Sequence, residues 1–106
     1  MTVADWITTR SPRAPDALLA RVVAVLGTDG ARPADETANV CVAAAARQLQ
    51  SLVDAGRFER ESAIDLLAVD ALVTFGFEHA STAARADLER LSGEAIMRLG
   101  ALTPSA

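Results

Sequence analysis

Residues 63–79 read AIDLLAVDALVTFGFEH, and this stretch decides which fold class we expect. Its length and its content of Leu and Ala favour an α-helix over a β-strand. Apolar side chains occupy nearly all of the helix circumference, and a helix of this kind is usually buried on several sides. The stretch therefore predicts a central helix over about residues 58–79 that packs inside a helical bundle.

Amphipathic segments lie on both sides of this central helix. The segment before it begins near Pro33 and ends at Gly56, and the segment after it begins with a cap at Ser81 or Thr82. Both carry apolar residues in alternating steps of four and three, a pattern typical of packed helices. These residues are Ala38, Val42, Ala45, Leu49 and Leu52 in the first segment, and Ala84, Leu88, Leu91, Ala95, Leu99 and Leu102 in the second. With a further helix over about residues 15–26, the pattern predicts an all-α protein, an antiparallel four-helix bundle.

The N-terminal residues are predicted to form a short helical arm outside this bundle. Thr2 and Asp5 have the spacing of a capping box, and the prolines that follow interrupt the helix. We therefore expect an arm and a proline-rich hinge over residues 1–14, the bundle over 15–103 and a tail over 104–106.

Composition and charge exclude several classes of function. Fourteen acidic residues against ten basic ones give a net charge of −4, which disfavours binding to nucleic acid. No apolar run approaches the roughly 20 residues that cross a bilayer, so we expect no membrane span. The first ten residues lack the basic start and the apolar stretch of a secretory signal, so the cytoplasm is the expected location.

The residues that most often carry chemistry are sparse. Cys41 is the single cysteine, which excludes an intrachain disulfide and favours a buried apolar role over a nucleophile. His79 is the single histidine, and it is not part of the Glu-x-x-His pairs that hold metals in bundles. We therefore expect no catalytic residue, no bound metal and no cofactor, and a protein that is not an enzyme.

Acidic residues on the central helix form the most informative polar pattern. Asp65 risks losing its hydration on an apolar helix, so we expect an Arg from a neighbouring helix beside it. Asp70, Thr74 and Glu78 follow one another at intervals of four residues and form a polar line. This line either faces water or lines a groove or an interface, and in the second case its three residues are candidate ligand-binding residues.

Small and aromatic residues suggest where a partner could bind. Ala38, Cys41 and Ala45 give the second helix of the bundle a surface that a neighbouring helix can approach closely. Trp6 precedes the hinge, and from there it can pack either on its own bundle or on a second subunit. These four residues are the candidate interface.

The segment LAVDALVTFGFE, residues 67–78, resembles one core helix of the trans-polyprenyl diphosphate synthases. Members of this family are all-α enzymes that elongate isoprenoid diphosphates with the help of magnesium. Asp70 and Thr74 are the matching polar positions. The aspartate-rich motif that holds the metal in the family is absent, and Val69 replaces the usual glycine before the aspartate, so the resemblance does not imply catalysis here.

Two functional hypotheses follow from these observations. The first is a non-enzymatic interaction module that associates with itself as a homodimer, or with a protein partner, because the chain is rich in apolar residues and lacks a catalytic constellation. The alternative is a carrier for an apolar, lipid- or isoprenoid-like ligand in the bundle core, with Asp70 and Thr74 at its mouth.

Overall fold

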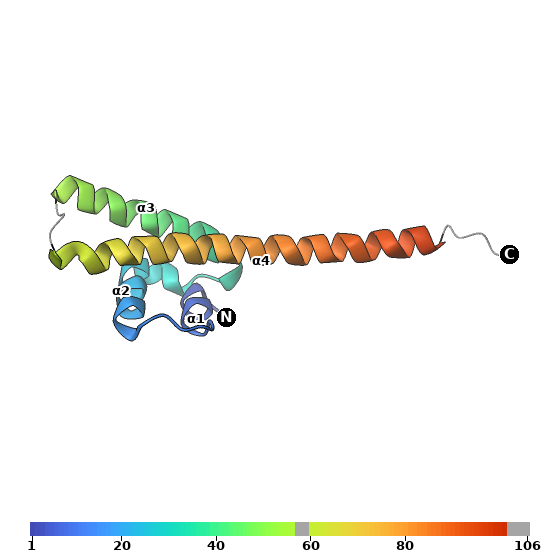
Figure 1. Cartoon of the computed structure of the whole chain (residues 1–106), viewed down its shortest axis with the longest axis horizontal. Helices are drawn as coiled ribbons and strands as arrows, with labels where there is room; N and C mark the ends of the chain where they lie inside the picture. Colours follow the sequence, from blue (N-terminus) through green and yellow to red (C-terminus); the bar gives the residue numbers. More distant parts are fainter. Residues whose placement is uncertain (57–59, 102–106) are drawn as a thin grey trace.

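The computed structural model describes residues 1–56 and 60–101, and its regular elements are all helical (Figure 1). The expected all-α class is therefore confirmed for the described residues. The α-helices are α1 (Val3–Thr8), α2 (Asp16–Leu26), α3 (Thr37–Ala55) and α4 (Ala63–Ala101), and the short 3-10 helices are η1 (Gly27–Ala31), η2 (Ala34–Glu36) and η3 (Arg60–Ser62). The expected tail, residues 104–106, lies outside the described residues.

The ends of the first three α-helices follow from local sequence signals. The Asp5 amide donates to the Thr2 hydroxyl at 3.1 Å, and the Thr2 amide donates to the Asp5 carboxylate at 3.0 Å, which completes the expected capping box. Hydrogen bonding of the Thr2 backbone amide and side chain to the carboxylate lowers the pKa of Asp5. Gly27 and Gly56 end α2 and α3 with positive φ angles of 56° and 62°, which glycine adopts without steric cost.

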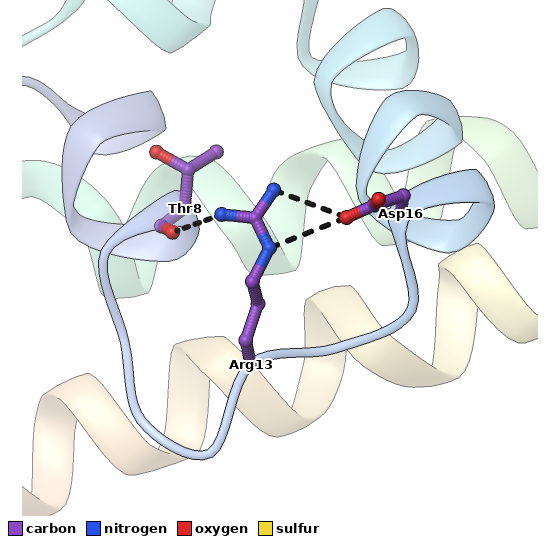
Figure 2. A network of polar contacts seen from close by, with 3 residues as sticks. All are labelled: Thr8, Arg13 and Asp16. Carbon is purple, nitrogen blue, oxygen red and sulfur yellow. Dashed lines mark hydrogen bonds and ion pairs between the residues drawn. The ribbon is translucent and has the colours of Figure 1, made fainter.

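The connection between α1 and α2 is held by one arginine (Figure 2). Arg13 donates from Nη1 to the Thr8 carbonyl at 3.4 Å, at the end of α1. It also donates from Nε and Nη2 to Asp16 Oδ1 at 3.3 and 3.2 Å, in the first turn of α2. These groups are exposed to solvent, so the network contributes orientation more than stability.

The α3 and α4 helices run side by side in opposite directions (Figure 1). They are in close contact at Gly76, where a Cβ atom would lie 3.1 Å from Val42 Cγ2 and 3.2 Å from the Ala38 carbonyl oxygen. A Cβ atom at this position would push both groups away by a few tenths of an ångström, so glycine suits this contact. Since Val42 is level with Gly76, Thr37 at the start of α3 is level with about residue 81 of α4, and α4 continues past that point without α3 beside it.

The buried core lies between the α3–α4 pair and the two N-terminal helices. The α1 and α2 helices lie on one side of the pair (Figure 1). The core cluster consists of Val3, Ile7, Leu19, Val22, Leu26, Val40, Cys41, Ala44, Ala45, Ala68 and Leu72. The Arg partner expected for Asp65 is Arg21 of α2, whose Nε lies 3.2 Å from Asp65 Oδ1 without the angle of a hydrogen bond.

The expected helix boundary at Ser81 or Thr82 is wrong. Here α4 is one continuous helix of 39 residues, about 58 Å long at 1.5 Å per residue. The Thr82 hydroxyl donates to the Glu78 carbonyl at 2.9 Å, four residues earlier in the same helix. A threonine that bonds in this way continues a helix and does not cap a new one. The antiparallel four-helix bundle is therefore not confirmed, because one α4 replaces the two helices expected there.

The expectation that residues 63–79 are buried on several sides is only partly met. Ala68, Leu72 and Gly76 are buried, and they share one face of α4. Leu66, Leu67 and Phe77 are 38%, 56% and 68% exposed. One side of this apolar helix therefore faces solvent in the single chain.

We predict opposite effects for alanine at two glycines of α4. Gly76→Ala should lower the free energy of unfolding by about 1–3 kcal/mol, because the new methyl group overlaps the Ala38 carbonyl and Val42. Gly93→Ala should raise helix content, because nothing lies within 4 Å of that position and Ala is favoured over Gly by about 0.5–1 kcal/mol. Urea unfolding followed by circular dichroism measures both variants. Equal gains in both would contradict the close contact.

We also predict that the Cys41 thiol does not react with thiol reagents while the chain is folded. Its side chain is 0% exposed, and this burial raises the pKa of the Cys41 thiol to about 11. The protonated thiol should react with a chromogenic disulfide reagent at pH 8 only at the rate of unfolding, and rapidly in 6 M guanidinium. Immediate reaction of the folded protein would show that α3 does not bury this face.

Candidate functional site

An apolar stripe along the second half of α4 is the strongest candidate for a functional surface. Every residue from 80 to 101 is exposed. The stripe consists of Phe77, Ala84, Leu88, Leu91, Ala95 and Leu99, and from here on we call these six residues the α4 stripe. Its large members Phe77, Leu88, Leu91 and Leu99 are 68%, 65%, 55% and 67% exposed. Their spacing of seven, four, three, four and four residues keeps them on one face of the helix over about 33 Å.

Charged side chains border this stripe. Asp87 lies at one edge of the stripe and pairs with Arg90 on the far side of the helix, whose Nη2 is 3.2 Å from Asp87 Oδ1. Near the end of the stripe, Leu91, Ala95 and Leu99 border an open hollow of about 390 Å³ together with Glu94 and Arg98. An apolar centre with a charged rim is the usual composition of a protein interface.

A second apolar row lies on the neighbouring part of α3. Val42, Leu49 and Val53 are 45%, 44% and 51% exposed and fall on one helix face, in steps of seven and four. Val42 contacts the helix at Gly76, next to Phe77 of the stripe. We call these three α3 residues the outer row. The outer row therefore adjoins the start of the α4 stripe.

Trp6 docks within its own chain. Its ring meets the His79 ring of α4 edge to face, with centroids 5.1 Å apart and an interplanar angle of 80°. The Arg10 guanidinium lies 4.2 Å above the Trp6 ring and also forms an ion pair with Glu78. The edge-to-face ring contact, the cation–π attraction and the ion pair together hold the arm on α4.

The other candidate interface residues also lie inside the chain. Cys41 and Ala45 are 0% and 3% exposed, and Ala38 presents its carbonyl oxygen to Gly76. Their small side chains do allow a close helix approach, but the approaching helix is α4 of the same chain.

The candidate ligand-binding residues follow one another along α4. Asp70 and Thr74 are exposed, and Glu78 is half-buried and turned to Arg10. A polar line on the outside of the helix fits the interpretations that it faces water or borders an interface. The ligand-carrier hypothesis stays a prediction, and no contact among these residues favours it.

A hollow of about 320 Å³ near the start of α3 combines charges of both signs. Arg32 Nη2 lies 2.7 Å from Glu36 Oε1, and Arg47 Nη2 lies 3.5 Å from Asp29 Oδ2. The Glu36 carboxylate also raises the pKa of Arg32. Because the two arginines are paired with two carboxylates, the hollow has little net charge with which to bind an ion.

Two further findings concern metals and membranes. Among the residues that the structure describes, no three His, Cys, Asp or Glu side chains come close enough together to hold a metal ion. Over the same residues, no helix combines the length and the apolar character that a membrane crossing requires.

The apolar spacing identified five of the six stripe residues, from Ala84 to Leu99, but not their exposure, and Phe77 was expected to be buried on the central helix. The apolar spacing between Ala84 and Leu99 predicted a packed helix, and the packing was assigned to the same chain. A sequence signal for the continuous α4 does exist. The run Ala80-Ser81-Thr82-Ala83 holds neither Gly nor Pro, so it does not force a turn between two helices.

We predict that Trp6→Ala loosens the arm and destabilises the chain. Removing a partly buried aromatic ring that contacts Arg10 and His79 should lower the free energy of unfolding by about 1–3 kcal/mol. Trp6→Phe keeps an aromatic ring in place and should lose less. Chemical denaturation measures the loss. A changed oligomeric state with unchanged stability would instead place Trp6 at a contact between subunits.

The chain matches no protein-family model, no curated protein and no solved structure. The resemblance of residues 67–78 to a polyprenyl diphosphate synthase helix therefore stays a prediction.

Proposed function

We propose that this protein is a non-enzymatic helical interaction module that associates with itself, and that the α4 stripe is its association surface. One observation carries the proposal: half of a 39-residue helix extends past α3 and exposes a regular row of apolar side chains. An apolar row that is rimmed by charge is typical of a surface that another helix covers.

The physics of isolated helices supports a partner for this segment. The second half of α4 has no packed apolar face in the single chain, although most helical stability in proteins comes from packing of such a face. Covering Leu88, Leu91 and Leu99 would contribute roughly 1.5–3 kcal/mol for each side chain that becomes fully buried. These contributions are large compared with the few tenths of a kcal/mol that a surface ion pair such as Asp87–Arg90 provides.

We place this module in the cytoplasm. The support is the cysteine content, because Cys41 is the single cysteine of the chain and a fold without an intrachain disulfide is usual in a reducing compartment. The half of α4 that carries the association surface contains no cysteine.

We predict that a charge in the α4 stripe weakens association. Leu88→Asp and Leu91→Asp should each raise the dimer dissociation constant at least tenfold, since a buried unpaired carboxylate costs more than about 1.4 kcal/mol. Met97→Asp is the matched control, because Met97 is 77% exposed and lies nine positions after Leu88, on the opposite side of the helix. Sedimentation equilibrium measures all three variants.

Two outcomes would contradict the proposal. A wild-type chain that stays monomeric at several hundred micromolar would show that the stripe is not a self-association surface. Equal weakening by Leu88→Asp and Met97→Asp would show that the added charge acts without regard to the face of the helix. Native mass spectrometry of the same samples reports whether a small molecule is retained.

A further inference from the structure

We propose that two copies pack their α4 helices antiparallel around a two-fold axis between residues 82 and 83. In this arrangement the second half of each α4 covers the outer side of the other copy's α3–α4 pair. The inference rests on the proposed self-association and adds its direction, its register and the residues that meet.

The lengths of the helices point to this register. The described α4 runs from Ala63 to Ala101, so its midpoint is Thr82. The part of α4 beside α3 ends near residue 81, and the exposed part begins at residue 80. An axis between residues 82 and 83, half a residue from this midpoint, therefore pairs the covered half of each helix with the uncovered half of the other, over nearly the whole described length of about 58 Å.

The apolar residues are complementary in this register. Phe77 comes level with Leu88 of the second copy, and Leu66 comes level with Leu99 of the second copy. Close to the axis the facing residues are Ser81 and Ala84, whose small side chains allow the helices to approach closely. Ten large apolar side chains, five from each copy, would each remove on the order of 60–100 Å² from water, which totals roughly 600–1,000 Å² and reaches at its upper end the roughly 1,000 Å² expected of a specific interface.

Charge complementarity favours this arrangement over the parallel one. Asp70 comes level with Ala95 of the second copy and within one helical turn of its Arg98, and both Asp70 and Arg98 are exposed. The two-fold axis makes this contact twice. A parallel dimer in register would instead place Asp70 beside Asp70 of the second copy, and like charges opposed in an apolar seam are destabilising.

The same arrangement supplies a helix for the outer row of α3. Since α3 lies beside the first half of α4, the incoming helix also passes close to Val42, Leu49 and Val53. Each end of the dimer would then contain α2, α3, the first half of α4 and the second half of the other α4. The four-helix bundle expected from the sequence is completed between copies, with residues 81–101 as its fourth helix.

Charge reversal tests the predicted contact between Asp70 and Arg98. Asp70→Arg and Arg98→Asp should each weaken the dimer about five- to tenfold, because each places like charges together at both ends of the interface. The double variant restores opposite charges in exchanged positions and should return to within about threefold of the wild-type affinity. Losses that simply multiply in the double variant would overturn the pairing.

Cysteine cross-linking with a short bismaleimide tests direction and register. A mixture of the Thr74→Cys and Ala95→Cys variants should cross-link. In the proposed dimer these exposed positions are offset along the helix axis by only about four residues, or about 6 Å. Ala95→Cys alone should not, since its two copies would lie about 37 Å apart along the axis, at 1.5 Å per residue. The wild-type chain, with only buried Cys41, controls for background.

The outcomes separate this inference from the proposed function. Cross-linking of Ala95→Cys with itself would show a parallel dimer, which overturns the register but keeps self-association through the stripe. A dimer in which neither the mixed nor the single variants cross-link would overturn the register as well. A wild-type monomer would overturn both the register and the proposed function.

Discussion

The close contact between α3 and α4 at Gly76 is the constraint on which the rest of the structure depends. With a hydrogen in place of a side chain at this position, Val42 and the Ala38 carbonyl come within about van der Waals distance of the α4 backbone. The contact fixes the register of the two helices, and α1 and α2 then close the core on one side of the pair. Because of this register, the first residue of α3 lies beside about residue 81 of α4. The register therefore also determines how much of α4 has no α3 beside it.

Local signals in the sequence determined much of the fold. The capping box at Thr2 and the glycines at positions 27 and 56 mark element ends in the structure because each satisfies a backbone requirement of its own. The partner of Asp65 was also predictable in kind, since a half-buried carboxylate requires a neighbouring cation.

The sequence did not predict which helices and side chains contact one another. Ser81 and Thr82 are acceptable both as helix caps and inside a helix, and here the Thr82 hydroxyl bonds to the Glu78 carbonyl within one continuous helix. The small residues of α3 indicated a close helix contact but not which helix makes it. Likewise, the composition of the arm did not distinguish docking of Trp6 on its own chain from docking on another, because that depends on where His79 and Glu78 lie.

The unbroken helix through residues 79–84 has a mechanical consequence. It joins the core and the stripe through one rigid rod, so the angle between the stripe and the α1–α2 side of the molecule is set by residue count alone. One residue inserted in this span would turn the stripe by about 100° around the helix axis, whereas seven would return it to within roughly 20° of its original direction. The number of residues between Gly76 and Leu88 therefore determines how far the stripe is rotated about the helix axis relative to the core, whatever the side chains in between.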